Sequence, residues 1–172
     1  MSNQKIEEVI SNAYVYVEGE QKLEERANAL DFIAHLRANE MEIPLLDPAG
    51  GMIDVGYKGE GVITMELEAP GTGDTALVSF ISIPSAWTKP DAQADERFKE
   101  IVWEHLRHCE INDCGDCSPG LSLTIFGKQF DNICKSSLMF DNPAGEALEC
   151  AKKAVDARIN EINDKACHGE NA

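Results

Sequence analysis

A chain of 172 residues is long enough to bury a hydrophobic core yet close to the usual size of one domain, so we expect a single domain over residues 1–172. Its formal net charge of -16 weighs against DNA or RNA as a partner, because nucleic-acid binding depends on Lys and Arg that neutralise phosphates. No apolar stretch is long enough to span a bilayer and the N-terminus has no signal-peptide pattern, which predicts no membrane partner and a cytoplasmic location.

The N-terminal part of the chain predicts two helices. Residues 3–17 carry apolar side chains at helical spacing, and residues 1–20 are a candidate N-terminal extension of the domain. A second helix is expected from Lys22 to Met41, with His35 on its polar side and Phe32 and Leu36 on a second apolar edge. The stripe expected to face the core consists of Leu23, Ala27, Leu30, Ala34 and Met41.

The middle of the chain predicts strands. Between residues 44 and 61, glycines and prolines mark turns between short extended pieces. Ile63, Met65 and Leu67 alternate with polar residues, which predicts a strand with one face in water. Residues 75–83 are apolar on both faces and therefore predict a central strand.

A third helix is expected after Pro90, with Asp91 as its N-terminal cap. Its apolar stripe runs through residues 98–102 and continues to His105 and Cys109. In this prediction Cys109 ends a helical surface that faces the core.

The last helix is expected to start with Asn142 as cap and Pro143 in its first turn. Cys150 lies off its apolar stripe, and Cys167 belongs to residues 166–172, which we expect to be a flexible tail. The stripe itself consists of Leu148, Ala151, Val155, Ile159 and Ile162. Together these elements predict an α+β fold, with an antiparallel sheet packed with helices followed by a C-terminal Cys-loop, hairpin and helix.

Four of the six cysteines have a spacing that suits a metal-ligand set, C-x4-C-x2-C-x16-C. Thiols of cytoplasmic proteins are kept reduced, which favours metal binding or redox chemistry over a disulfide framework. The predicted metal ligands are Cys109, Cys114, Cys117 and Cys134.

The distant Cys134 can join the other three if the chain folds back on itself. Glycine at the first position of Gly127-Lys128 suits a two-residue hairpin turn, and that register places Cys134 opposite Leu121. Leu121 is only four residues beyond Cys117. Residues 109–134 are therefore expected to form a Cys-rich loop and hairpin that hold a four-thiolate Zn²⁺.

Alternatives to zinc stay open. Plant-type ferredoxins use the same C-x4-C-x2-C spacing with a distant cysteine to hold a [2Fe-2S] cluster. Cys114-Gly115-Asp116-Cys117 has the form of a redox dithiol, although neighbouring acids disfavour its thiolate. Some of the four could also be ordinary buried cysteines. His105 is an alternative metal ligand, its other interpretation being a histidine at the edge of the core that is bonded to the backbone.

The C-terminal part of the chain carries a series of short motifs. They are Ser118-Pro119-Gly120, Thr124-Ile125-Phe126-Gly127-Lys128, Phe130-Asp131-Asn132-Ile133-Cys134, Phe140-Asp141-Asn142-Pro143 and Glu146-Ala147-Leu148-Glu149-Cys150. This stretch resembles the C-terminal part of a family of small uncharacterised bacterial proteins with a Cys-loop. The family has no assigned activity, so the resemblance implies a shared structural unit and no catalytic residue.

No phosphate-binding loop, dinucleotide fingerprint, zinc-protease motif or nucleophile elbow is present in the sequence, which predicts no nucleotide cofactor. Trp87, Trp103 and Tyr57 could line a ligand pocket, but aromatic residues are more often part of a core. The sequence therefore predicts a non-enzymatic binding or regulatory domain, stabilised by structural zinc, with a small ligand or a protein as partner. An electron-transfer or thiol redox protein, or an enzyme with an unrecognised pocket, is the alternative.

Overall fold

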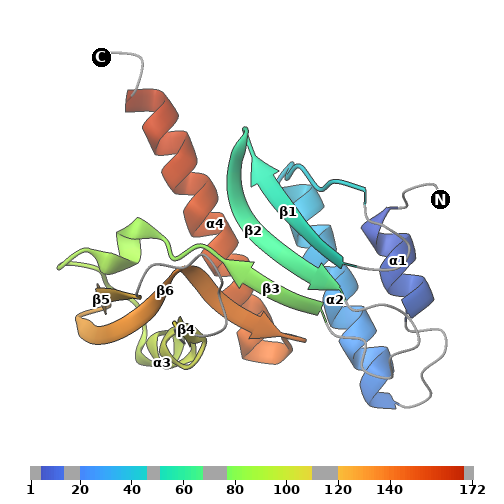
Figure 1. The fold of residues 1–172 in the computed structure, drawn as a ribbon, viewed down its shortest axis with the longest axis horizontal. Coiled ribbons are helices and arrows are strands. Elements are labelled where there is room, and N and C mark those ends of the chain that lie inside the picture. The colour runs from blue at the N-terminus through green and yellow to red at the C-terminus, as the bar shows by residue number, and fades with distance from the viewer. Residues whose placement is uncertain (1–4, 14–19, 46–50, 68–76, 110–119, 169–172) are drawn as a thin grey trace.

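The computed structural model describes residues 5–13, 20–45, 51–67, 77–109 and 120–168. In them the chain forms an antiparallel sheet with helices, the α+β fold predicted from the sequence (Figure 1). The elements in chain order are α1 (Ile6–Ala13), α2 (Glu20–Ala38), β1 (Gly51–Tyr57), β2 (Glu60–Leu67), β3 (Leu77–Ile81), the 3-10 helix η2 (Ser85–Thr88), α3 (Glu96–Glu104), β4 (Leu106–His108), β5 (Leu121–Ile125), β6 (Lys128–Asp141) and α4 (Gly145–His168).

The sheet has six strands in the order β1-β2-β3-β6-β4, and β5 pairs with β6 beside this path. Strand β2 shows the predicted alternation: Ile63, Met65 and Leu67 are buried, whereas Thr64 and Glu66 are only half-buried. The buried side of β2 belongs to the hydrophobic core, so the expectation of a strand with one wet face is confirmed.

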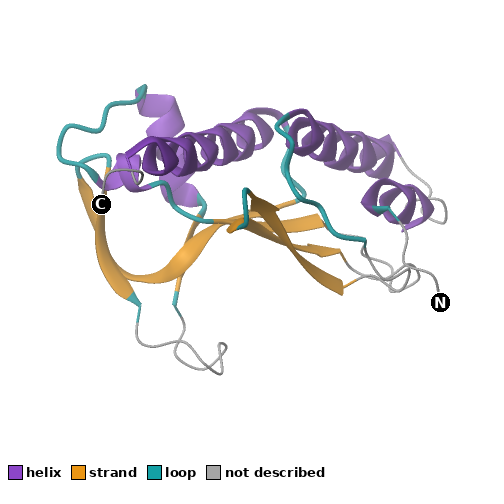
Figure 2. Ribbon diagram, turned by 90° about the horizontal axis from the view of Figure 1, so that it is seen from above, coloured by secondary structure: helices purple, strands orange, loops and turns teal. Residues whose placement is uncertain are grey.

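Strand β3 lies between β2 and β6, which is the central position expected from its sequence. Its two faces are not covered equally. Leu77 and Ile81 are fully buried, whereas Val78 and Phe80 are half-buried. Figure 2 shows the reason, since the described helices lie on one side of the sheet. Val78 and Phe80 point to the opposite side, which we call the uncovered face.

Helix α2 buries a different face from the predicted one. Of the predicted stripe, Leu23 is 62% exposed and Ala27 and Ala34 are exposed as well, whereas Leu30 is half-buried and Met41, beyond the end of α2, is buried. The buried side chains of α2 are Ala29, Phe32, Ile33 and Leu36. Phe32 and Leu36 remove more apolar surface from water than two alanines do, so packing favours the rotation of the helix that covers them. The predicted second edge is therefore the real core face.

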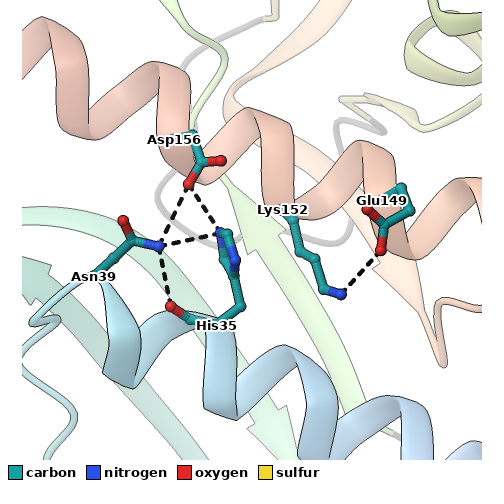
Figure 3. Close-up of polar contacts among 5 residues, drawn as sticks. All are labelled: His35, Asn39, Glu149, Lys152 and Asp156. Carbon is teal, nitrogen blue, oxygen red and sulfur yellow. Dashed lines mark hydrogen bonds and ion pairs between the residues drawn. The ribbon is translucent and has the colours of Figure 1, made fainter.

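A polar cluster joins α2 to α4 (Figure 3). His35 Nε2 lies 2.8 Å from Asp156 Oδ1, and both side chains are partly buried. Asn39 donates to the main-chain carbonyl of His35 at 3.0 Å and also approaches Asp156 Oδ1 at 3.5 Å. The polar side of α2 on which His35 was expected is thus an interhelical contact.

Lys152 adds a second polar contact between the same two helices. Its ammonium group lies 2.7 Å from Asp31 of α2 and 2.9 Å from Glu149 of α4, the latter drawn in Figure 3. Hydrogen bonds to Asp31 and then Glu149 raise the pKa of Lys152, so the lysine stays charged at any physiological pH.

The N-terminal ends of α3 and α4 differ from the prediction. In α3 the Phe98 N–H donates to Asp95 Oδ1 at 2.9 Å, so the cap is Asp95 and not Asp91. Helix α4 begins only at Gly145, so Asn142 is not its cap and Pro143 lies before its first turn. The Asn142 side chain instead accepts a hydrogen bond from the Leu77 N–H at 2.9 Å and so bonds the end of β6 to β3.

Helix α3 also ends earlier than predicted. At His105 the chain enters the sheet, where the Met139 N–H donates to the His105 carbonyl oxygen at 2.8 Å. Strand β4 follows, so Cys109 lies beyond a strand and not on the helical stripe. The pairing with β6 outweighs the helical periodicity of this segment. It satisfies backbone N–H and C=O groups of β6, which would stay unpaired if α3 continued for another turn.

Helix α4 confirms the predicted stripe, whose five residues are all buried. Cys150 was expected to lie off the stripe, yet it is only 1% exposed. The helix packs against α2, α3 and the sheet at once, so its buried face is wider than one stripe. It continues to His168 and thereby includes the first residues of the predicted tail, with Cys167 exposed.

The hairpin of β5 and β6 forms, but its turn is Phe126-Gly127 and not Gly127-Lys128, since Ile125 pairs with Lys128. Both central residues have positive φ, 49° and 79°, as a type I′ turn requires. The left-handed conformation is unfavourable for Phe126, but its buried ring packs 5.4 Å from that of Trp87. Burial of the ring offsets the backbone strain.

We predict that Ser79→Ala raises stability. Ser79 is fully buried in β3, and its hydroxyl has no hydrogen-bond partner among the residues that the structure describes. A buried unsatisfied hydroxyl costs about 1–3 kcal/mol, so removing it should raise the free energy of unfolding by about 1 kcal/mol in urea denaturation. The control is Ser122→Ala, at an exposed serine that donates to Asp131 at 2.7 Å, and it should leave stability equal or slightly lower. A destabilised Ser79→Ala would contradict this account.

Candidate functional site

The structure brings two of the predicted ligands, Cys109 and Cys134, onto neighbouring strands. Cys109 directly follows β4, and its N–H donates to the Asn132 carbonyl oxygen of β6 at 2.7 Å. Cys134 lies two residues beyond Asn132 on β6. It is therefore the diagonal neighbour of Cys109, across from the end of β4. Both cysteines are buried, with exposed fractions of 3% and 5%.

Asn132 bonds to Cys109 and packs against Gly120, the two described residues on either side of segment 110–119. Its side-chain amide donates to the Cys109 carbonyl oxygen at 2.6 Å, in addition to the main-chain bond. On the other side lies Gly120, where a Cβ atom would come within 2.6 Å of the Asn132 carbonyl carbon. Asn132 itself has a φ of 60°, a left-handed conformation that asparagine tolerates better than most residues. The chain therefore leaves and returns to the sheet at a single residue of β6.

The predicted register of the hairpin was wrong by one residue at this point. Leu121 pairs with Ile133 rather than with Cys134. The change of turn moves the pairing by two residues, and an irregularity between Leu121 and Leu123 moves it back by one. Cys134 still directly follows the partner of Leu121, so the hairpin does return the fourth cysteine to the start of β5.

Cys114 and Cys117 lie outside the described residues. In the described part of the chain, no group of three or more His, Cys, Asp or Glu residues could hold a metal ion. The four-thiolate set therefore remains a prediction, in which two members have known positions and two are linked to them by short segments.

His105, the alternative ligand, makes contacts at the edge of the core. Its Nδ1 lies 2.8 Å from the Ile101 carbonyl oxygen, a distance at which an Nδ1–H donates to that oxygen. Its ring stacks on Phe140 with the centroids 4.4 Å apart. These contacts match the interpretation of His105 as a backbone-bonded histidine.

The other two cysteines lie on α4. Cys150 borders a hollow of about 490 Å³ between α3 and α4, and burial raises the pKa of its thiol to about 12. It is therefore protonated and a poor nucleophile near neutral pH. Cys167 is exposed.

The three aromatic residues considered as pocket candidates do not share a pocket. Trp87 is 8% exposed and packs in the core against Phe98 at 5.4 Å. Tyr57 donates its hydroxyl hydrogen to Asn163 of α4 at 3.3 Å. Trp103 borders a separate hollow on α3, beside Lys128 of the hairpin. Sequence reasoning missed this pair because only the packing of α3 against the hairpin brings the two residues together.

Comparison with known proteins gives no relative from which a function could be transferred. No family model, no curated protein and no solved structure matches the chain. Within the described segments, no helix has the length and apolar character needed to cross a membrane. What the protein does is therefore inferred from its own residues.

The approach of Gly120 to Asn132 predicts that Gly120→Ala is destabilising. A Cβ at this position meets backbone atoms that cannot rotate away, so strands β5 and β6 must shift. Such overpacking costs about 1–3 kcal/mol, measurable as a lower free energy of unfolding in urea. Gly61→Ala is the matched control, because nothing lies within 4 Å of a Cβ there and the change should be nearly neutral. Equal stability of the two variants would rule out the close approach.

The raised pKa of Cys150 predicts a difference in thiol reactivity within α4. In folded protein at pH 8, iodoacetamide should modify Cys167 at least ~100-fold faster than Cys150, because the thiolate reacts and each pKa unit lowers its fraction about tenfold. Peptide mass spectrometry measures both rates, and in urea they should become similar. Since the folded pKa lies above the unfolded value of 9.0, this thiol should also make the fold less stable as pH rises from 9.0 towards 12. Equal rates in the folded state would contradict the burial of Cys150.

Proposed function

We propose that the protein is a non-enzymatic binding or regulatory domain whose C-terminal half is held together by a structural Zn²⁺ bound to Cys109, Cys114, Cys117 and Cys134. The observation that carries this proposal is the contact of Asn132 with Cys109 and Gly120, the residues on either side of segment 110–119, next to the buried Cys134. Four thiolates fill a tetrahedral site and leave no position for a reactive water, so such an ion would act in folding and not in hydrolysis.

The length of the segment supports convergence of the four thiols. Cys114 is five residues after Cys109, and Cys117 is three residues before Gly120. An extended chain advances roughly 3.3–3.6 Å per residue, so both spans are long enough to fold back to the starting point. Because Cys109 and Gly120, on either side of the segment, both contact Asn132, closing the segment around an ion costs little additional chain entropy.

The backbone around Cys109 and Cys134 is irregular, and a metal ion bound there would stabilise it. Strand β4 has only three residues, and its pairing with β6 shifts register between Leu106 and His108. The pairing of β5 with β6 is irregular in the same region. Short strands with few regular pairs are weakly held, and a bound ion adds the stabilisation that such a junction lacks.

The charge of the neighbouring residues favours a bound cation over a reactive thiol. Glu110, Asp113 and Asp116 accompany the cysteines in the sequence. Nearby negative charge raises the pKa of a free thiol and so opposes redox or nucleophilic use, whereas a divalent cation is attracted to it. Zinc is preferred to a [2Fe-2S] cluster because Cys109 follows a strand and Cys134 lies on a hairpin strand, whereas plant-type ferredoxins carry their motif in one long loop.

The uncovered face of the sheet supports a binding role. Met52 and Met139 are 67% and 39% exposed there, and the half-buried Phe80 pairs with Met139 across the strands. Asp54 and Glu66 lie on the same side of the neighbouring strands. Because the Arg107 guanidinium lies 5.1 Å from the Phe80 ring centre, this face combines apolar side chains with charges of both signs, which suits a partner that presents apolar and charged groups.

Removal of the metal should lower the melting temperature. We expect Cys117→Ser to lose zinc and to melt about 10 °C below the wild type, since free zinc at about 100 times its dissociation constant stabilises the folded state by roughly 3 kcal/mol. Cys167→Ser is the matched control, because Cys167 is exposed on α4, and it should keep both its zinc and its melting temperature. A chelator should bring the wild type and Cys167→Ser down to the Cys117→Ser value and leave Cys117→Ser unchanged. Elemental analysis and thermal denaturation provide the measurements.

Three outcomes would contradict the zinc proposal. The first is an unchanged melting temperature in metal-depleted protein. The second is iron with visible absorption after anaerobic purification, which would indicate an iron-sulfur cluster on the same cysteines. The third is a reversible loss of two thiols without any metal, which would indicate a dithiol.

A further inference from the structure

Two aromatic rings and a lysine meet where α3 packs on the hairpin. The ammonium nitrogen of Lys128 lies 4.6 Å from the ring centre of Trp103 and 5.1 Å from that of Phe130. Both distances are within the range in which a cation is attracted to the face of an aromatic ring. The two rings therefore already hold a cation, supplied by the chain itself.

The rings are held in place by the fold. The Trp103 indole N–H donates to the Ile125 carbonyl oxygen at 3.1 Å, which fixes the side chain of α3 against β5. Phe130 belongs to β6 and pairs with Leu123. The ring centres of Trp103 and Phe130 are 6.2 Å apart, with the planes inclined at 47°. Such a fixed, angled pair forms two walls of an aromatic cage, so that only the Lys128 side chain has to move to open it.

Carboxylates complete the surroundings of this hollow. Trp103, Phe130 and Lys128 line it together with Glu100 and Glu104, and its volume is about 260 Å³. Glu100 is paired with Arg97 at 3.4 Å. Within the described residues, Lys128 lies within ion-pair distance of neither glutamate. Glu104 therefore adds negative potential to the hollow without a direct ion pair to the resident lysine, although part of its charge is offset by Arg97.

We propose that Trp103, Phe130 and Glu104 form a binding site for a quaternary ammonium ion, and that the Lys128 ammonium occupies this site until such an ion displaces it. A lysine ammonium is strongly hydrated and keeps its hydrogen bonds to water only at the surface. A quaternary ammonium group has no N–H to hydrate, so it gains more by moving against aromatic faces. The chain's charge of -16 also raises the local concentration of any cation. The site goes beyond the zinc proposal and uses none of its ligands.

The test is a titration of the folded, metal-replete protein with tetramethylammonium chloride at constant ionic strength. The readout is the indole N–H NMR signal of Trp103, distinguished from that of Trp87 by its loss in Trp103→Phe. We expect a weak but saturable shift in the wild type. Lys128→Met should bind about fivefold more tightly because the competing cation is gone, and Glu104→Gln should bind about twofold to threefold more weakly.

Lys153→Met is the matched control. Lys153 also lies over an aromatic ring, that of Phe98 at 5.0 Å, but outside this hollow. Its loss should leave the Trp103 titration unchanged. The proposal is overturned if the Trp103 signal does not saturate in Lys128→Met, or if Lys128→Met and the wild type bind equally. Lys128→Gln serves as a second variant should the methionine perturb the turn.

The quaternary ammonium group could belong to a free small molecule or to a methylated lysine side chain. Choline and the free amino acid trimethyllysine distinguish these sources in the same titration of Lys128→Met. Tighter binding of choline would assign the site to a small molecule, and tighter binding of trimethyllysine would assign it to a modified protein. Failure of both to bind would overturn the proposal together with the tetramethylammonium result.

Discussion

Strand β6 is the element on which the rest of the sheet depends. It pairs with β5 through residues 128–133, with β4 through residues 133–138 and with β3 through residues 138–141, so among the described strands it has three partners. Figure 1 shows it in orange, passing from the hairpin to the centre of the sheet. Its pairing is regular beside β3 and irregular beside β4 and β5. The same strand thus joins a well-packed half of the molecule to a half with few regular pairs.

The two proposed sites lie along this less regular half. Cys134 and the Asn132 contacts are on β6 itself, and Phe130 contributes one wall of the cation site. Helix α3 supports the hairpin from the side through the bond from Trp103 to Ile125. The core stabilises the end of β6 that pairs with β3. A metal ion at the cysteines, together with helix α3 packed at the aromatic rings, would stabilise the opposite end of the strand. Binding functions commonly lie on such segments, next to a rigid scaffold.

Local patterns in the sequence predicted the parts of the fold that depend on local physics. The alternation in β2 and the apolar stripe of α4 are periodic patterns, and the residues that they predict to be buried are buried in the structure. The face of α2 could not be chosen in this way, because two apolar stripes compete and only the packing of Phe32 and Leu36 against the rest of the molecule decides between them. The turn at Phe126 was missed for a similar reason, since its strained backbone is tolerated only because the ring is buried.

For the candidate site, the sequence suggests a set of ligands, and the structure tests only the positions of Cys109 and Cys134. The spacing of the cysteines is visible in the sequence, and the return of Cys134 follows from the hairpin even with the register displaced by one residue. The role of Asn132 carries no local signal, because its left-handed backbone results from the irregular pairing of β5 with β6. The contact of Lys128 with Trp103 is likewise a product of tertiary packing.

The central claim is that four cysteines hold a zinc ion at the irregular end of β6. X-ray absorption at the zinc edge of the purified protein tests it most directly, because the spectrum reports the number and kind of ligand atoms. We predict one zinc per chain with four sulfur neighbours at about 2.3 Å. A first shell of nitrogen and oxygen, or protein purified without zinc, would contradict the account.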